Sequence, residues 1–236
     1  MTSPSVAAPG RALPRPVVDW LLWIAVALVA GVYVRAIYFT PLEALQGPSQ
    51  KIYYIHLGAV TGGYLAFSVV AVMSLVHLWL RDDRADRLAA SACEVAIVFF
   101  TVILITGPLW ARPIWGAWWS WELRTTLTLL LWFLGLGYLI MRGAIEDPAM
   151  RARYSAVLGM LQALLIPFIH LSVYLVKAMH PMPILLKPAQ PSLPREMLTT
   201  LLFSLASFAL LSIALMRARY RLSLLEELNR PGSEVR

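Results

Sequence analysis

Six long apolar windows constrain the fold of this 236-residue chain more than any other feature. A helix needs about 20 mostly apolar residues to cross the roughly 30 Å hydrocarbon core of a bilayer. The windows without acidic or basic side chains are Trp20 to Val34, Ile52 to Leu80, Val95 to Ala111, Thr125 to Met141, Tyr154 to Val176 and Met197 to Met216. The chain is 59% hydrophobic and only 14% charged. The sequence therefore predicts an all-α, polytopic membrane protein with six transmembrane helices.

The first window is short for a membrane span, and basic residues precede it as they do in signal peptides. The stretch from Ala27 to Ala30 is only a faint match to a cleavage site, and aromatic and branched residues continue past it to Phe39. Arg35 can extend its charge to the interface, and the apolar run resumes at Ala36. We therefore expect this segment to be the first transmembrane helix.

Basic residues are distributed unevenly between the two sides that six crossings would create. One side includes eleven arginines at or near the helix ends, namely Arg11, Arg15, Arg81, Arg84, Arg87, Arg142, Arg151, Arg153, Arg217, Arg219 and Arg221. The other side has Lys51, Arg112, Lys177, Lys187 and Arg195, with Arg35 at its edge. Short basic loops tend to stay in the cytoplasm, so both termini are expected to be cytoplasmic. The net charge of +7 then reflects topology, and no nucleic-acid partner is predicted.

These windows divide the chain into a six-helix transmembrane domain over residues 17–221 and two cytoplasmic tails, the flexible residues 1–16 and residues 222–236. Two of the three predicted external loops are a tryptophan-rich loop over 109–124 and a proline-rich loop over 178–196, and the latter should be extended. Gly107 and Pro108 are predicted to end the third helix, because proline cannot continue helical hydrogen bonding. Gly58 and Gly62 are spaced so that another helix can approach closely.

The tryptophan-rich loop contains four indoles within seven residues: Trp115, Trp118, Trp119 and Trp121. Glu122 and Arg124 follow at once. Such a cluster suits either a membrane interface or a flat aromatic ligand. On a helix, residues 115, 118, 119 and 122 would share one face, which would present three indoles and a carboxylate together.

The four histidines differ in where the topology places them. His56 and His77 are 21 residues apart on one predicted helix, about 31 Å, so they cannot serve one ligand. His56 and His180 both fall at the external end, level with the tryptophan-rich loop. Two neutral imidazoles are suitable axial ligands for a porphyrin iron, although either one could instead simply bond a backbone carbonyl. His77 is predicted to be interfacial, and His170 to make a supporting polar contact.

The run from Trp115 to Arg124, with His56 before it and His180 after it on a six-helix frame, resembles the haem exporter C proteins of bacterial cytochrome c maturation. The resemblance covers most of the chain. It implies that His56 and His180 are axial ligands of haem b iron, and that Trp115, Gly116, Trp118, Trp119, Trp121, Glu122 and Arg124 form the surrounding haem-binding segment. Glu122 stands where that family usually has aspartate, and Thr125 where it usually has leucine.

The resemblance also implies a location and partners. The protein would be a non-enzymatic component of the cell inner membrane that delivers haem, held without a covalent bond, to a periplasmic haem chaperone. An ABC-type ATPase subunit, a second membrane subunit and a small membrane protein would work beside it in the lipid bilayer. Arg124, and also Arg112, are candidates to pair with the haem propionates.

Two other function classes remain open on the sequence. One is a b-type cytochrome that passes electrons to or from quinol, which normally needs histidine ligands on facing helices. The other is an ABC-transporter permease subunit for a different small molecule, in which the indoles would only anchor the protein in the membrane. The lone Cys93 excludes an internal disulfide, and the absence of a Cys-x-x-Cys-His motif excludes a c-type cytochrome.

Overall fold

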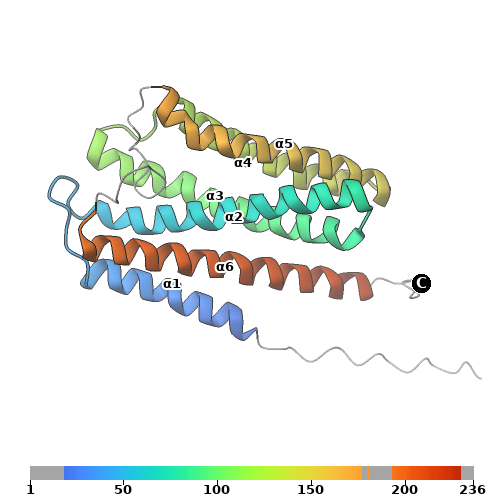
Figure 1. Ribbon diagram of the computed structural model, residues 1–236, viewed down its shortest axis with the longest axis horizontal. Helices are drawn as coiled ribbons and strands as arrows, with labels where there is room; N and C mark the ends of the chain where they lie inside the picture. The colour runs from blue at the N-terminus through green and yellow to red at the C-terminus, as the bar shows by residue number, and fades with distance from the viewer. Residues whose placement is uncertain (1–18, 177–179, 181–192, 230–236) are drawn as a thin grey trace, which may run out of the picture.

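The computed structural model describes residues 19–176, 180 and 193–229, and this part of the chain is helical with short connections (Figure 1). The helices are α1 (Trp20–Tyr38), α2 (Gln50–Leu80), α3 (Asp83–Trp115), α4 (Leu123–Ala144), α5 (Pro148–Leu175) and α6 (Arg195–Leu228). All six are long and apolar enough to cross a membrane. The predicted fold class and the number of transmembrane helices are therefore confirmed.

The helices form a bundle in which α2 and α3 are central (Figure 1). The α4–α5 pair covers one side of them, and α6 with α1 covers the other. The start of α1 lies against the last part of α6, where Asp19 forms ion pairs with Arg217 at 3.6 Å and Arg221 at 3.4 Å. The chain thus enters α1 and leaves α6 at the same end of the bundle. The tryptophan-rich loop and His180 lie at the opposite end.

Glycines on α2 let the neighbouring helices α3 and α6 approach it closely. A Cβ added at Gly58 would lie 2.4 Å from Phe208 Cδ2 of α6, and one at Gly62 would lie 2.9 Å from Phe99 Cζ of α3. Ser204 Oγ of α6 also donates to the Tyr54 carbonyl at 2.6 Å. Small residues and interhelical hydroxyl bonds are the usual means of tight packing between membrane helices. The expected close approach at Gly58 and Gly62 is confirmed.

The predicted end of the third helix at Gly107 and Pro108 is wrong. α3 continues to Trp115 and contains both Pro108 and Pro113. Proline removes a backbone hydrogen bond, but membrane helices tolerate this loss when neighbouring groups satisfy the freed carbonyls. Gly116 ends the helix with φ of 77°, a left-handed conformation that glycine adopts readily. The turn into the tryptophan-rich loop is therefore set by Gly116.

This later ending also overturns the predicted shared face of residues 115, 118, 119 and 122. Trp115 is the last residue of α3, whereas residues 116–122 are not helical. The indoles are instead distributed along a bent loop between α3 and α4.

Two further boundaries differ from those expected. α5 ends at Leu175, and α6 begins at Arg195, inside the predicted external loop 178–196. α6 then continues to Leu228, so the first part of the predicted tail 222–236 is helical. The predicted tail over 1–16 and most of the proline-rich loop lie outside the described residues.

Candidate functional site

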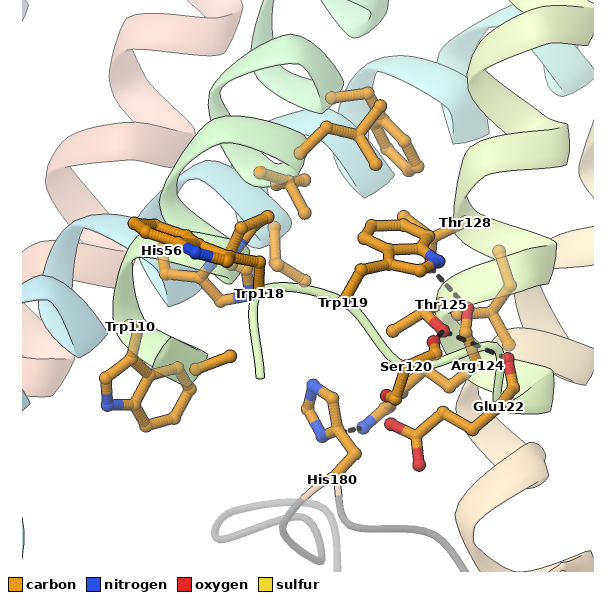
Figure 2. A pocket seen from close by; sticks show the side chains of 18 of the residues that line it. His56, Trp110, Trp118, Trp119, Ser120, Glu122, Arg124, Thr125, Thr128 and His180 are labelled. Carbon is orange, nitrogen blue, oxygen red and sulfur yellow. Dashed lines mark hydrogen bonds between the residues drawn. The ribbon is translucent and has the colours of Figure 1, made fainter. Parts of the chain in front are cut away.

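A largely apolar pocket lies at the end of the bundle where α3 passes into α4 (Figure 2). Its walls come from α2, α3, the loop 116–122, the start of α4 and one residue of α5, and His180 closes it from beyond α5. Both His56 and His180 line this pocket. Two imidazoles that are 124 positions apart in the sequence are therefore brought to one site.

His56 is held in a fixed orientation on α2. Its side chain is buried, and Nδ1 lies 2.9 Å from the hydroxyl oxygen of Thr106 on α3. Thr106 uses its own proton to donate to the Val102 carbonyl at 2.7 Å, so the hydroxyl accepts from His56 Nδ1–H. In a neutral imidazole this leaves Nε2 without a proton and with a free lone pair. Metal binding through Nε2 requires that tautomer, and a second residue usually fixes it in this way.

His180 is held differently, by an arginine. Arg124 Nη1 lies 3.1 Å from His180 Nδ1 (Figure 2). Guanidinium can only donate, so Nδ1 accepts and a neutral His180 has its proton on Nε2. The two histidines of the pocket are thus in opposite tautomers. His56 presents a free Nε2, whereas His180 must release Arg124 before Nε2 of a neutral ring can bind a metal.

Three of the four predicted indoles line the pocket: Trp115, Trp118 and Trp119. Trp118 is 57% exposed and forms the outer part, with the Arg112 guanidinium 6.0 Å from its ring centroid. The buried Trp119 Nε1–H has no acceptor among the described residues. The pocket wall therefore offers both a flat apolar surface and one unused donor.

Gly116 and Trp121 lie outside the pocket lining. Gly116 terminates α3, and its carbonyl accepts a hydrogen bond from Arg112. Trp121 is 77% exposed and packs edge-on against Trp119 at a centroid distance of 5.8 Å. The structure places both residues in the loop that carries the site, not in its wall.

Glu122 and Arg124 both line the pocket at the start of α4. Glu122 is the residue that precedes the helix, and Thr125 Oγ1 donates to its carbonyl at 3.0 Å. Arg124 forms a hydrogen bond to His180, which links a charged residue at the start of α4 directly to a candidate ligand.

Two residues that contact the site residues were not predicted from the sequence. Trp110 is 4% exposed, lies 5.9 Å from the His56 ring and donates from Nε1 to Gln46 Oε1 at 3.1 Å. A sequence prediction that continued the third helix to Trp115 would have placed Trp110 on the same helix, close to the tryptophan-rich loop. Thr106 gave no such signal, because it is 50 residues from His56 in the sequence.

The remaining histidines lie outside the pocket lining. His77 is at the opposite end of α2, and its Nδ1 is 2.9 Å from the Asp82 carbonyl oxygen. This agrees with an interfacial histidine in the α2–α3 turn. His170 is on α5, with its ring 6.4 Å from that of Tyr174.

Comparison with known proteins identifies the family. The family model described as Heme exporter protein C matches residues 4–233. The chain belongs to the Heme exporter protein C family. Relatives of that name include a Bradyrhizobium diazoefficiens protein, 34% identical over 94% of this chain and 84% of the relative. The Escherichia coli (strain K12) relative is 31% identical over 90% and 87% of the two chains. The Haemophilus influenzae relative is 31% identical over 80% and 77%.

Membership in the Heme exporter protein C family agrees with the fold. The match extends from before α1 to beyond α6, so it includes the pocket, the tryptophan-rich loop and His180. The chain is accordingly a multi-pass membrane protein of a haem-handling family, and the name of that family describes transport rather than catalysis.

Proposed function

We propose that this protein binds haem b at the pocket end of the bundle, on the periplasmic side of the inner membrane, and delivers it to a periplasmic haem chaperone during cytochrome c maturation. The observation that carries the proposal is the presence of His56 and His180 in one pocket with three indoles. Family membership favours haem handling over a quinol-dependent cytochrome and over a permease for another molecule.

The distribution of charge supports the periplasmic placement of the site. Among the described residues, the pocket end has Arg35, Lys51, Arg112, Arg124 and Arg195. The opposite end has Arg81, Arg84, Arg87, Arg142, Arg151, Arg153, Arg217, Arg219 and Arg221. Basic residues near the ends of membrane helices favour the cytoplasm. The pocket would then face outward, where a periplasmic chaperone can reach it.

The pocket can hold only part of a porphyrin ring. Its volume of about 130 Å³ is below the roughly 300–1,000 Å³ of typical ligand sites. The ring would therefore extend from the pocket toward the exposed face of Trp118. Non-covalent binding in such a partly open site leaves one edge of the haem accessible to an acceptor.

The side chains have separate tasks in this proposal. His56 supplies an oriented Nε2 to the iron, and the indoles exclude water from the ring faces. Arg124 exchanges His180 for a haem propionate, because a guanidinium–carboxylate pair is a stronger charge-assisted bond than a guanidinium–imidazole contact. His180, once released, becomes the second axial ligand. Trp119 Nε1–H is a further donor available to a propionate.

The partners proposed for this handover are an ATPase subunit, a second membrane subunit and a small membrane protein. The bundle has apolar surface for such neighbours or for lipid. On α1, for example, Trp20 is 71% exposed and Trp23 is 63% exposed. Exposed tryptophans at a helix end are typical of the membrane interface.

The test is spectroscopic. Purified protein in detergent is titrated with haem, and the Soret and visible bands are followed for wild type, His56→Ala, His180→Ala and the double variant. We expect the wild type to give a low-spin, bis-histidine spectrum, the single variants to lose it, and the double variant to bind haem weakly. His77→Ala is the matched control, because His77 lies at the other end of α2. A wild-type spectrum from the double variant would disprove the ligand assignment.

Delivery needs a second measurement. Haem-loaded protein is mixed with the soluble domain of the periplasmic chaperone, and the haem is located after separation by size. We expect transfer from the wild type and slower transfer after His56→Ala, which should fail to orient the haem. Equal transfer by both proteins would leave haem binding intact but overturn the role of the site in delivery.

A further inference from the structure

A second cleft, much larger than the haem pocket, opens at the opposite end of the bundle. Its volume is about 1,040 Å³, and its walls are polar over a large part of their surface. The end of α2, the start of α3, the end of α4, the start of α5 and the end of α6 all contribute to it. It shares no lining residue with the haem pocket, and buried core residues such as Phe67 and Val70 on α2 lie between the two.

Six arginines line this cleft: Arg81, Arg87, Arg142, Arg151, Arg153 and Arg219. Half of them are neutralised by ion pairs within the cleft. Arg87 pairs with Glu227 at 2.5 Å, Arg142 with Asp86 at 2.6 Å, and Arg219 with Glu94 and Glu226. These pairs use four of the five acidic side chains in the lining, and only Asp83 is left.

The other three arginines, Arg81, Arg151 and Arg153, form no ion pair with any residue in the described part of the chain. Arg151 provides a second, independent sign of a missing ligand. Its Nε atom is buried from solvent and has no hydrogen-bond acceptor among the described residues. A buried guanidinium donor without an acceptor is unfavourable, and a bound anion would satisfy it.

Guanidinium groups bind phosphate oxygens through paired, charge-assisted hydrogen bonds. The cleft also has an apolar wall that includes Leu78, Leu139 and Met150. It lies at the ends of membrane-spanning helices, where phospholipid headgroups are found, and basic pockets between such helices bind anionic lipids. We propose that this cleft binds a phosphate group, held by Arg81, Arg151 and Arg153. An anionic phospholipid and a soluble phosphate share this chemistry, and the experiment below separates them.

The first arm of the test uses the full chain. Protein in detergent is incubated with equal amounts of phosphatidylglycerol and phosphatidylcholine, and bound lipid is counted by native mass spectrometry. We expect phosphatidylglycerol to be retained preferentially. A parallel titration with inorganic phosphate at constant ionic strength, followed by thermal stability, measures binding of the soluble anion. Preference for the lipid with no effect of phosphate assigns a lipid site, and stabilisation by phosphate alone assigns a soluble ligand. No preference and no stabilisation would overturn the proposal.

The second arm uses Arg81→Gln, Arg151→Gln and Arg153→Gln, singly and together. Each should weaken binding of the favoured anion about five-fold. Arg84→Gln is the matched control, because Arg84 is in the same turn as Arg81 but does not line the cleft. Haem binding at the distant pocket reports on folding of each variant. If the triple variant does not fold, the single variants decide, and wild-type anion binding by all three would contradict the proposal. Displacement of the bound anion by haem would overturn it too, since the cleft would then be a second haem site.

Discussion

Arg124 Nη1 and His180 Nδ1 are 3.1 Å apart, and this bond holds one of the two candidate iron ligands in the tautomer that cannot bind iron through Nε2. His56 is held by Thr106 in the opposite, binding-competent tautomer. The site is therefore asymmetric, with one candidate ligand ready and the other restrained. Haem that approaches with its propionates toward Arg124 would release His180 in the same event.

This relationship predicts different behaviour toward haem and its dimethyl ester, which has no propionate charge. In Arg124→Leu, we expect affinity for haem to fall roughly 10- to 100-fold, because a charge-assisted hydrogen bond is lost. Affinity for the ester should change little or increase, since His180 is no longer restrained. Titrations followed at the Soret band measure both. Arg195→Leu is the control, because Arg195 is an exposed residue at the same end of the bundle that does not line the pocket. An equal loss for haem and ester would argue against the exchange.

The hydroxyl of Thr106 is expected to affect haem binding only through its hydrogen bond with His56. Thr106→Val removes the acceptor for His56 Nδ1–H, so the ring loses its fixed tautomer. We expect haem affinity to fall roughly 10- to 100-fold, with a smaller low-spin fraction in the electron paramagnetic resonance spectrum. Thr106→Ser keeps the hydroxyl and should restore both properties. Identical spectra for the valine and serine variants would show that the bond has no role.

The indoles of the tryptophan-rich loop should differ in their contribution to haem affinity. Trp119→Phe removes both ring area and the unsatisfied donor from the pocket, and should lower haem affinity roughly three- to ten-fold. Trp121→Phe is expected to stay within about two-fold of wild type, because Trp121 is exposed and outside the lining. The same haem titration measures both variants. A larger loss of haem affinity in Trp121→Phe than in Trp119→Phe would contradict the placement of Trp119, and not Trp121, in the wall of the haem site.

Packing of α2 against α6 predicts a strong effect of a single methyl group. Gly58→Ala would place Cβ 2.4 Å from Phe208 Cδ2 and 2.6 Å from Ser204 Oγ, so the helices must separate. We expect a loss of about 1–3 kcal/mol in stability, seen as a lower Tm in detergent. Gly137→Ala on α4 is the matched control, since a Cβ there meets nothing within 4 Å. A Tm for Gly58→Ala equal to that of the control would refute this view of the interface.

The ion pairs at the arginine-rich end should contribute unequally to the stability of the fold. Asp86→Asn breaks a two-pronged pair with Arg142, with oxygen–nitrogen distances of 2.6 and 2.8 Å, and both side chains are mostly buried. We expect a loss of about 1–3 kcal/mol in stability, because a mostly buried guanidinium is left without its charged acceptor. Glu227→Gln breaks the more exposed pair with Arg87 and should cost less than about 1 kcal/mol. Thermal unfolding of both variants in detergent measures the difference, and equal losses would contradict it.

The sequence was sufficient for the features that depend on composition along the chain. Long uncharged windows require helices in a bilayer, so six crossings followed directly. The spacing of Gly58 and Gly62 indicated a close helix contact for the same local reason. Helix ends were less predictable. Pro108 was expected to end α3, but neighbouring helices can support a proline inside a membrane span, and α3 continues to Trp115.

The relations between distant residues were decided only by the tertiary structure. The sequence placed His56 and His180 at one end of the molecule, but not in one pocket. It gave no means of finding Thr106 as the partner of His56, nor His180 as the partner of Arg124, because those bonds join residues 50 and 56 positions apart. Hydropathy acts on each segment alone and fixes which segments enter the membrane. Hydrogen-bond partners, and with them the tautomers of both histidines, depend on how the segments pack together.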